Sequence, residues 1–195
     1  MDEDKVDSLA IEAWKKTVDV QQHFNEICMK IRNVFATLIA GLCALIGILE
    51  TRAKDIMIPA FGYEIHGVLF VFLGIFGISM LFYFVDRHWY HRLLVGSVMS
   101  GLDVEQYLSQ RAPGFSLTSK IGDNSALDIT KCTVSNWILF LLAKVLFAEV
   151  TEKEGKYLLR SDAKLAIFYK SVAYLSVIAF LFFAWAGGIV AVPTD

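Results

Sequence analysis

Charged residues are scarce in this chain of 195 residues: Lys, Arg, Asp and Glu make up 19% of it, whereas hydrophobic residues make up 56%. So little charge is unusual for a soluble domain of this length and indicates a membrane protein. The formal net charge of −2 also lacks the basic excess that nucleic-acid-binding proteins usually have. We therefore expect a lipid bilayer, and no nucleic acid, as a partner.

Cysteines and catalytic motifs are also rare. Cys28, Cys43 and Cys132 are odd in number and widely spaced, which argues against a disulfide scaffold or a zinc site. The sequence contains no glycine-rich phosphate loop, no Gly-x-Ser-x-Gly, no His-Glu-x-x-His and no Cys-x-x-Cys. We therefore predict that the protein is not an enzyme and has neither a cofactor nor a metal. The acidic start, Met-Asp-Glu-Asp-Lys, precedes an amphipathic stretch, so we expect no signal peptide there.

Long apolar runs dominate what is present. Crossing a bilayer core of about 30 Å takes about 20 apolar helical residues. Runs at 34–49, 65–85 and 171–192 predict three transmembrane spans, the first of them short, joined by a turn at 51–65 and by a long polar region. A shorter apolar run at 136–150 predicts a helix that lies in the membrane interface or re-enters the membrane; the alternative is a fourth span.

The first span continues an amphipathic helix, because neither glycine nor proline separates it from residues 6–33. Gln21 lies off the apolar stripe of this helix. The stripe follows the helical period and comprises Val20, Phe24, Ile27, Ile31 and Val34. We expect one helix over 6–49, of which only the end crosses lipid.

The second span also leads into a polar region without a helix breaker between Gly77 and Val95. We expect this helix to end at Gly101 and to be followed by a water-exposed connector at 101–135, with a short helix at 104–110. The two long helices would then form a hairpin that extends into the cytoplasm. The predicted fold is thus an all-α integral membrane protein.

Four segments follow from this interpretation. Residues 1–33 form a cytoplasmic amphipathic helix, 34–85 a transmembrane hairpin, 86–164 a cytoplasmic stalk helix with connector and interfacial helix, and 165–195 the final transmembrane helix.

The distribution of Lys and Arg predicts the orientation. Eleven of the 18 lie in 86–170 and five in 1–33, whereas the 51–65 turn holds two. The positive-inside rule then places the N-terminus and the 86–170 region in the cytoplasm of a multi-pass inner-membrane protein. Three spans satisfy this distribution, whereas a fourth at 136–150 would place the positive charges of 153–170 on the opposite side.

The segment 82–94 reads Phe-Tyr-Phe-Val-Asp-Arg-His-Trp-Tyr-His-Arg-Leu-Leu and marks the transition from apolar to polar helix. Polar-edged aromatic rings and arginines favour the headgroup layer. We predict a membrane-interface anchor or switch formed by Asp86, Arg87, His88, Trp89, Tyr90, His91 and Arg92. A metal site at the two histidines and Asp86, a pH-sensitive switch, and an ion pair of Asp86 with Arg87 or Arg92 remain as alternatives.

Small and hydroxyl residues mark two further sets in the spans. Small residues let helices approach closely in lipid, and the helix-packing candidates are Ala36, Ala40, Ala44, Gly74, Gly77, Ala184 and Gly188. Hydroxyl side chains at membrane depth line a pore in an oligomer or bond to their own helix carbonyls; these are Thr37, Ser79, Ser171 and Ser176.

The 82–94 segment resembles a signature that follows a span in a group of small bacterial inner-membrane proteins. The stretches beginning at His23 (His-Phe-Asn-Glu-Ile) and at Ser161 (Ser-Asp-Ala-Lys-Leu-Ala-Ile-Phe-Tyr) are similar to such chains as well. The layout is similar to the RipA-type octameric membrane proteins and to multi-span effectors found beside bacterial antiphage systems. This resemblance implies a homo-oligomer and membrane permeabilisation on a cytoplasmic signal.

Three hypotheses about function follow. The first is a pore-forming or membrane-perturbing effector, controlled by a cytoplasmic protein or a small-molecule signal. The second is a non-conducting scaffold that recruits a cytoplasmic partner. The third is an enzyme that acts on lipid or envelope substrates at His88 and His91.

Overall fold

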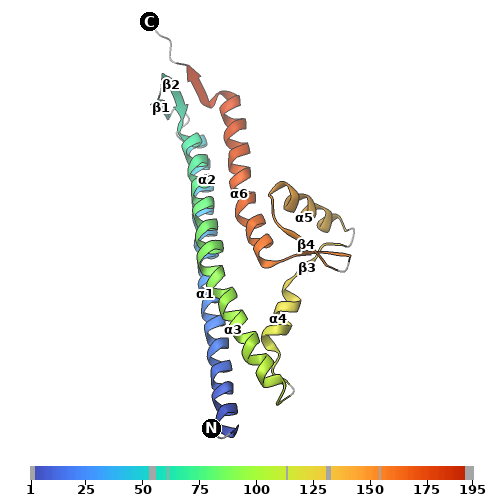
Figure 1. Ribbon diagram of the computed structural model, residues 1–195. Helices are drawn as coiled ribbons and strands as arrows, with labels where there is room; N and C mark the ends of the chain where they lie inside the picture. The colour runs from blue at the N-terminus through green and yellow to red at the C-terminus, as the bar shows by residue number, and fades with distance from the viewer. Residues whose placement is uncertain are drawn as a thin grey trace. The chain divides into compact units, whose positions relative to one another are not determined.

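Long helices make up most of the protein, with two small antiparallel sheets beside them. The computed structural model (Figure 1) describes residues 3–52, 56–60, 62–112, 114–130, 133–153 and 155–191. The chain divides into two units: unit 1 is Met1–Ile31 with Phe84–Ala166, and unit 2 is Arg32–Tyr83 with Ile167–Asp195. The division into four segments expected from the sequence concerns position in a membrane and stays a prediction.

The first helix, α1, runs from Glu3 to Arg52 without a break (Figure 1). The predicted continuous helix over 6–49 is therefore confirmed, and the helix is longer at both ends. Its sequence contains no proline, and its glycines, Gly41 and Gly47, both fall in the apolar part. A helix of this composition has no residue that forces it to stop.

The second long helix is continuous but not uniform. It consists of α2 (Gly67–Val85), η1 (Asp86–Tyr90) and α3 (His91–Ser109). η1 is a π-helical turn, in which the backbone N–H of His91 donates to Asp86 O, five residues earlier rather than four. The segment predicted to pass from the span into a polar helix is thus helical throughout, with a wider turn at its charged residues.

Gly101 does not end this helix, as the sequence predicted; α3 continues through it to Ser109. The separate short helix expected at 104–110 is therefore wrong. A Cβ on Gly101 would lie 2.4 Å from Gln21 Nε2 and 3.2 Å from Thr118 Oγ1. Glycine is present here because two other helices pass close to α3, not because α3 stops.

Within unit 1, α1 packs on α3 through polar groups. Gln21 Nε2 donates to Ser97 O at 3.1 Å, and Trp14 Nε1 donates to Glu105 Oε1 at 3.1 Å. Gln21 was expected off the buried stripe, whereas Leu9, which continues the stripe towards the N-terminus, is exposed. Of the predicted stripe, Val20, Phe24, Ile27 and Ile31 are half-buried and Val34 is exposed; Gln21 shares the half-buried face through a hydrogen bond, which hydrophobic periodicity does not detect.

The rest of unit 1 combines two short helices with a sheet. The elements are α4 (Leu117–Ser125), β3 (Leu127–Asp128), α5 (Val134–Val145), β4 (Val150–Lys153) and β5 (Lys156–Leu159). The strands are antiparallel in the order β3-β5-β4. Gly155, with φ of 72°, turns the chain between β4 and β5, a backbone conformation that glycine adopts readily. The charged stretch at 151–164, for which the sequence predicted no strand, therefore contains a hairpin and the start of the next helix.

Unit 2 contains the remainder of α1, most of α2, most of α6 (Ser161–Phe183) and a second sheet. Its other elements are β1 (Met57–Ala60), β2 (Tyr63–His66), η2 (Ala184–Gly188) and β6 (Ile189–Ala191). The strand order is β1-β2-β6. The turn expected at 51–65 thus includes a hairpin, and the last helix continues from α6 through the π-helical η2 to Gly188 rather than to about 192. The all-α prediction is correct for the long elements and wrong in omitting both sheets.

An aromatic cluster forms the core of unit 2. Phe35 is 1% exposed, and its ring centroid lies 4.8 Å from that of Tyr169 and 5.5 Å from that of Phe82. Val68 and Leu69 of α2 are also buried. Phe35 and Tyr169 are far apart in sequence, so this cluster holds α1, α2 and α6 together.

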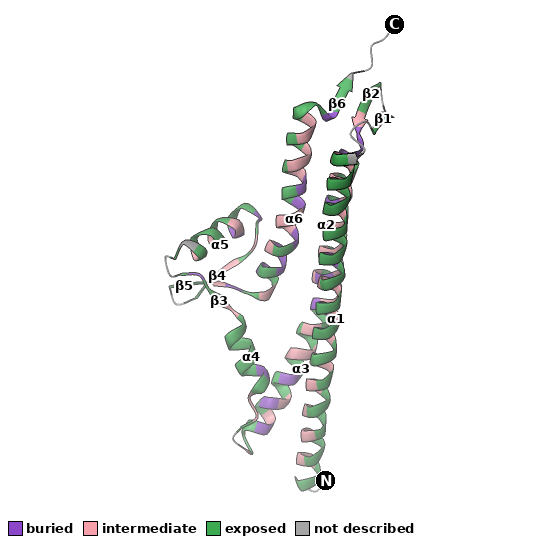
Figure 2. Ribbon diagram, turned by 180° about the vertical axis from the view of Figure 1, so that it is seen from behind, coloured by how far each residue is buried: buried purple, intermediate pink, exposed green. Residues whose placement is uncertain are grey.

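Three helical stretches are long and apolar enough to cross a membrane: Asp4–Thr51, Gly67–Ser109 and Ser161–Gly188. Of their most apolar windows, only 6%, 22% and 28%, respectively, are buried inside the protein. Figure 2 shows how much of α1 is exposed. These candidate spans indicate contact with a lipid bilayer, whereas the apolar part of α5 is too short to cross one.

Candidate functional site

The predicted interface segment separates into three environments. Asp86 is fully buried, whereas Trp89 is 63% exposed. The basic side chains of the segment lie on another side, which η1 and the first turn of α3 build together. The wide turn therefore places neighbouring residues in different environments: the Asp86 carboxylate is buried, the Trp89 indole is exposed, and the basic side chains share one face.

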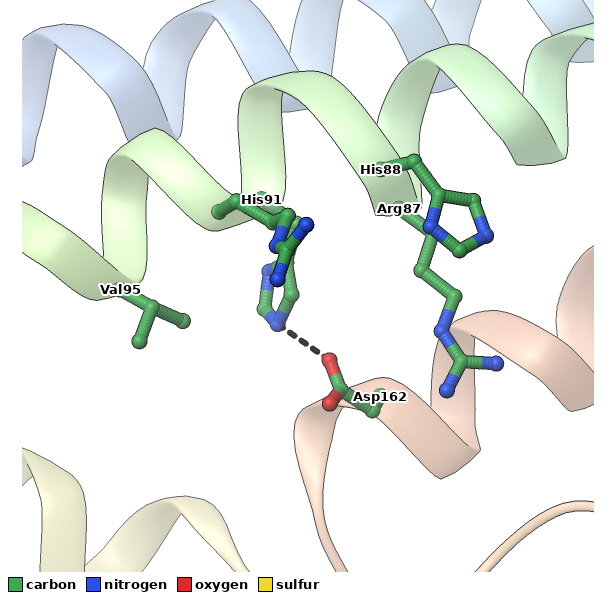
Figure 3. A pocket seen from close by; sticks show the side chains of 6 residues that line it. Arg87, His88, His91, Val95 and Asp162 are labelled. Atoms are coloured by element: carbon green, nitrogen blue, oxygen red, sulfur yellow. Dashed lines mark ion pairs between the residues drawn. The ribbon is translucent and has the colours of Figure 1, made fainter.

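That basic face borders a cleft of about 460 Å³. All of its lining residues belong to unit 1; they are Arg87, His88, His91, Arg92, Val95 and Asp162. Figure 3 shows Arg87 and His91 extending from the η1–α3 helix towards the start of α6, which carries Asp162. The volume lies in the range of small-molecule sites.

An ion pair joins the two sides of the cleft. His91 Nε2 lies 2.7 Å from Asp162 Oδ1, and the Asp162 side chain is about half exposed (Figure 3). His91 itself is buried, and its Nδ1 is buried without a hydrogen-bond partner among the described residues. One nitrogen of this imidazole is therefore fixed by Asp162, while the other has an unused hydrogen-bonding position.

The lining carries more positive than negative charge. Arg87 and Arg92 outnumber Asp162 even when both histidines are neutral. Guanidinium groups bind carboxylate and phosphate oxygens through paired hydrogen bonds. Asp162 lies in the first turn of α6, where the backbone N–H groups of a helix also favour an anion. The arrangement is suited to binding an anion.

A metal site does not form from the predicted residues. Asp86 does not line the cleft with His88 and His91. Within the described ranges, no three His, Cys, Asp or Glu side chains gather closely enough to hold a metal ion.

A second buried acid lies elsewhere in unit 1, at the junction of α1, α3 and α4. Glu105 is 3% exposed and accepts hydrogen bonds from Trp14 Nε1 at 3.1 Å, Thr118 N at 2.7 Å and Ser119 N at 3.2 Å. Burial alone raises the pKa of this carboxyl, but the hydrogen bonds from Thr118, Trp14 and Ser119 outweigh it, so the pKa of Glu105 lies below its ordinary value. Glu105 is thus an ionised group that caps the N-terminus of α4.

Unit 2 has a smaller cavity of about 360 Å³, which Glu50 and His66 line together with Phe183 and residues 186–188. Glu50 Oε1 is buried without a hydrogen-bond partner among the described residues. This cavity has one acid and one imidazole, and therefore fewer converging charges than the cleft of unit 1.

The predicted helix-packing residues are mostly on the surface. Ala36, Ala40 and Ala44 are exposed on α1, and the exposed Cys43 and Gly47 share their side of the helix. Gly74, half-buried, and Gly77, exposed, would each have no described atom within 4 Å of an added Cβ.

The last two predicted packing residues lie in η2. Ala184 is half-buried and Gly188 is buried. A Cβ on Gly188 would lie 2.9 Å from Phe183 O and 3.3 Å from Leu69 Cδ1, so Gly188 packs inside unit 2.

The four predicted hydroxyls all donate to carbonyls of their own helices. Thr37 and Ser171 donate to Asn33 O and Ile167 O. Ser79 donates to Ile75 O and Ser176 to Ala173 O, each at 2.7 Å, and both serines are buried. Of the two alternatives open from the sequence, this geometry favours the helix-carbonyl bond for all four.

Two site residues were not found from the sequence. They are Asp162, in the first turn of α6, and Glu105, in the region 101–135 that was expected to be a water-exposed connector. An acid in a helical first turn is a usable signal for Asp162, but nothing local pairs it with His91, which precedes it by 71 residues.

Comparisons of the chain with models of protein families, with curated proteins and with solved structures find no match.

Proposed function

We propose that the protein is a multi-pass membrane protein that assembles as a homo-oligomer and changes membrane permeability on a signal received by unit 1. In this proposal it lies in a bacterial inner membrane with its N-terminus in the cytoplasm. The resemblance to antiphage-associated effectors extends the proposal to a role in defence.

The observation that carries the proposal is the uncovered apolar surface of α1. Only 6% of its most apolar window is buried by the rest of the chain. An apolar surface of this length is stable only against lipid or against another protein. The three candidate spans therefore support insertion into a bilayer, and α1 has the most surface left for a neighbouring copy.

The exposed side of α1 supports self-association. Its small side chains recur at Ala36, Ala40 and Ala44, with Cys43 and Gly47 on the same side. In lipid, where dispersion and close contact drive helix association, such a face allows two backbones to approach.

The test combines assembly and leakage. Purified protein is reconstituted into vesicles loaded with a self-quenching dye, with and without cell extract on the side of unit 1. We expect dye release and a defined oligomer for the wild type, and loss of both in Ala40→Leu, because the larger side chain separates the helices. Val34→Leu enlarges another exposed position of α1 and serves as the matched control. A wild-type protein that never releases dye would end the permeability proposal.

A non-conducting scaffold is the second candidate, and the serine geometry favours it. Ser79 and Ser176 are buried within the protomer and are bonded to their own helices, so they do not face a shared lumen as placed. A scaffold predicts an oligomer that captures a cytoplasmic protein through unit 1 and leaves vesicles sealed. Retention of that protein by Ser79→Ala and Ser176→Ala, without leakage in any variant, would support this function.

A further inference from the structure

The cleft of unit 1 has features of a ligand site that the proposed function does not explain. A headgroup anchor needs only basic side chains on a surface, whereas here Arg87, His88 and Arg92 line an open cleft of about 460 Å³ together with a buried histidine. The ion pair of His91 with Asp162 closes one side. A surface anchor does not require this closure.

The chemistry of the lining selects the kind of ligand. Two guanidinium groups and two imidazoles supply only nitrogen donors and lone pairs, and the single lining carboxylate belongs to Asp162. The six lining residues include no Trp, Tyr or Phe on which a nucleobase would stack. A compact group with several anionic oxygens matches these donors better than a planar aromatic ligand does.

His91 supplies a second, independent observation. It is 8% exposed and its Nδ1 has no partner among the described residues, although it lies beside the cleft. Buried polar atoms in proteins are nearly always paired with protein, water or ligand. Because Nδ1 is itself buried, the ring atom available to an anion is Nε2, which already binds an anionic oxygen of Asp162 at 2.7 Å.

We propose that this cleft binds the phosphate group of an anionic ligand, and that Asp162 competes with the ligand for His91. The phosphate comes either from a phospholipid headgroup or from a soluble phosphate compound. The inference goes beyond the proposed function, because it holds for a conducting and a non-conducting protein alike; only the lipid source rests on membrane insertion. Arg87 lies two residues after Val85, the end of the apolar α2, which is where a span would meet headgroups.

Asp162 allows a test in which two substitutions are expected to change phosphate affinity in opposite directions. It is the one lining group that repels an anion, so its neutralisation should strengthen phosphate binding, while loss of an arginine should weaken it. Asp162→Asn keeps an oxygen that can accept a hydrogen bond from His91. Two substitutions with opposite effects cannot both be explained by general loss of folding.

The first arm of the experiment measures soluble phosphate. The full chain in nanodiscs of zwitterionic phosphatidylcholine is titrated with inorganic phosphate at constant ionic strength, and the thermal midpoint is recorded. If the source is soluble, we expect the midpoint to rise, with an apparent affinity about tenfold weaker in Arg92→Gln and tighter in Asp162→Asn. Lys120→Gln removes the same charge from exposed α4 of the same unit and should match the wild type.

The second arm measures lipid. The protein is extracted from membranes of phosphatidylcholine mixed with phosphatidylglycerol, and the retained lipids are quantified by mass spectrometry. If the source is a lipid, we expect enrichment of phosphatidylglycerol, reduced in Arg92→Gln, increased in Asp162→Asn and unchanged in Lys120→Gln. The proposal is overturned if neither arm shows a preference, or if Arg92→Gln and Lys120→Gln change binding equally. Phosphate binding without dye release would uphold this inference and remove the permeability proposal.

Discussion

Glu105 connects three helices of unit 1 through one carboxylate. Its donors are Trp14 on α1 and the first backbone N–H groups of α4, while Glu105 itself lies on α3. Hydrogen bonds to a charged acceptor contribute about 1.5–3 kcal/mol each, and a buried group left without them costs a similar amount. A substitution here should loosen the whole junction rather than one contact.

Stability should therefore depend on the ionisation of Glu105. Its folded-state pKa lies below its ordinary value of 4.5, so the folded protein binds fewer protons than the unfolded chain between these two values. The stabilisation is fully present above the ordinary pKa and is lost as pH falls through the lower one. Glu105→Gln should lower the free energy of unfolding of unit 1 by about 1.5–3 kcal/mol at neutral pH and flatten its dependence on acid pH.

The measurement is the thermal midpoint of wild type and Glu105→Gln at pH values from neutral to acid. Glu12→Gln is the matched control, because Glu12 is an exposed acid on α1 of the same unit. A variant that keeps the wild-type pH dependence would show that Glu105 does not carry it.

Substitutions at Gly96 and Gly101 distinguish two effects on stability: the intrinsic helix propensity of α3 and the close packing of its neighbours. Glycine to alanine in a helix gains about 1 kcal/mol when the site is open. No described atom lies within 4 Å of a Cβ at Gly96, whereas at Gly101 the Cβ would displace Gln21 from Ser97 O. We expect Gly96→Ala to stabilise the protein and Gly101→Ala to lose that gain or more, as measured by thermal unfolding. Equal stabilisation by both would contradict the close packing at Gly101.

Residue chemistry was predictable where neighbours in sequence are neighbours in space. Arg87, His88, His91 and Arg92 recur within two turns of one helix, and the structure brings all four to one cleft. Asp162 joins them only through the tertiary fold. Hydrophobic periodicity likewise finds no signal for Gln21, because its contact is a hydrogen bond.

The short helix α5 presents a strongly apolar exposed face. Trp137, Ile138, Leu141 and Val145 are exposed along it. Phe147 follows with φ of 51° and is 80% exposed. It occupies the left-handed position after the helix, where Ala148 N donates to Ala143 O, and glycine is the usual residue there.

We therefore expect Phe147 to lower the stability of α5 and to increase its contact with lipid. A non-glycine residue in this conformation costs about 1 kcal/mol, so Phe147→Gly should raise the stability of α5 by about that amount. If α5 lies in the membrane interface, as its sequence predicts, the same substitution should weaken its contact with lipid. Both effects are measured together, by thermal unfolding and by an environment-sensitive dye at Val145→Cys in a chain without its native cysteines.

Brominated lipids should quench the dye at position 145 but not at Lys120→Cys, which is exposed on α4 of the same unit. Equal quenching at the two positions, or none at 145, would refute interfacial placement of α5.

The sequence did not predict the strands because each of them contains only a few residues. β4 and β5 have four residues each and hold Lys153 and Lys156 opposite one another beside the turn. β6 has three residues and follows a candidate span, so its apolar residues extend the hydrophobic run. Alternation over so few residues does not stand out from a charged loop or from a helix end.

On the scale of the whole molecule, the long helices were the most predictable feature. Sequences of this length and apolarity without proline specify helices before any tertiary contact is known, as α1 illustrates. The sheets and the cleft depend on contacts between distant segments, and sequence periodicity does not encode these.

The orientation of the protein in the membrane can be predicted from its positive charges and tested by labelling. Lys and Arg concentrate in 1–33 and 86–170, so both regions should lie on the cytoplasmic side. In intact cells a membrane-impermeant thiol reagent should label Tyr63→Cys of the exposed β2, and should reach Asp4→Cys and Lys120→Cys only after lysis. Labelling of Lys120→Cys without lysis would reverse or break the proposed topology.

The π turn at Asp86–Tyr90 determines where a homologous chain can lose a residue without rotating the rest of the helix. A π turn holds one residue more than the α turn it replaces, and an α-helix advances by about 100° per residue. Deleting one of these five residues would let the turn close as a regular α turn and would leave the later side chains at nearly the same angle, whereas the same deletion within α2 would rotate them by about 100°. After a deletion in the π turn His91 would still meet Asp162, so among homologous chains that keep this pair we expect a single-residue gap in this helix to fall at these five positions.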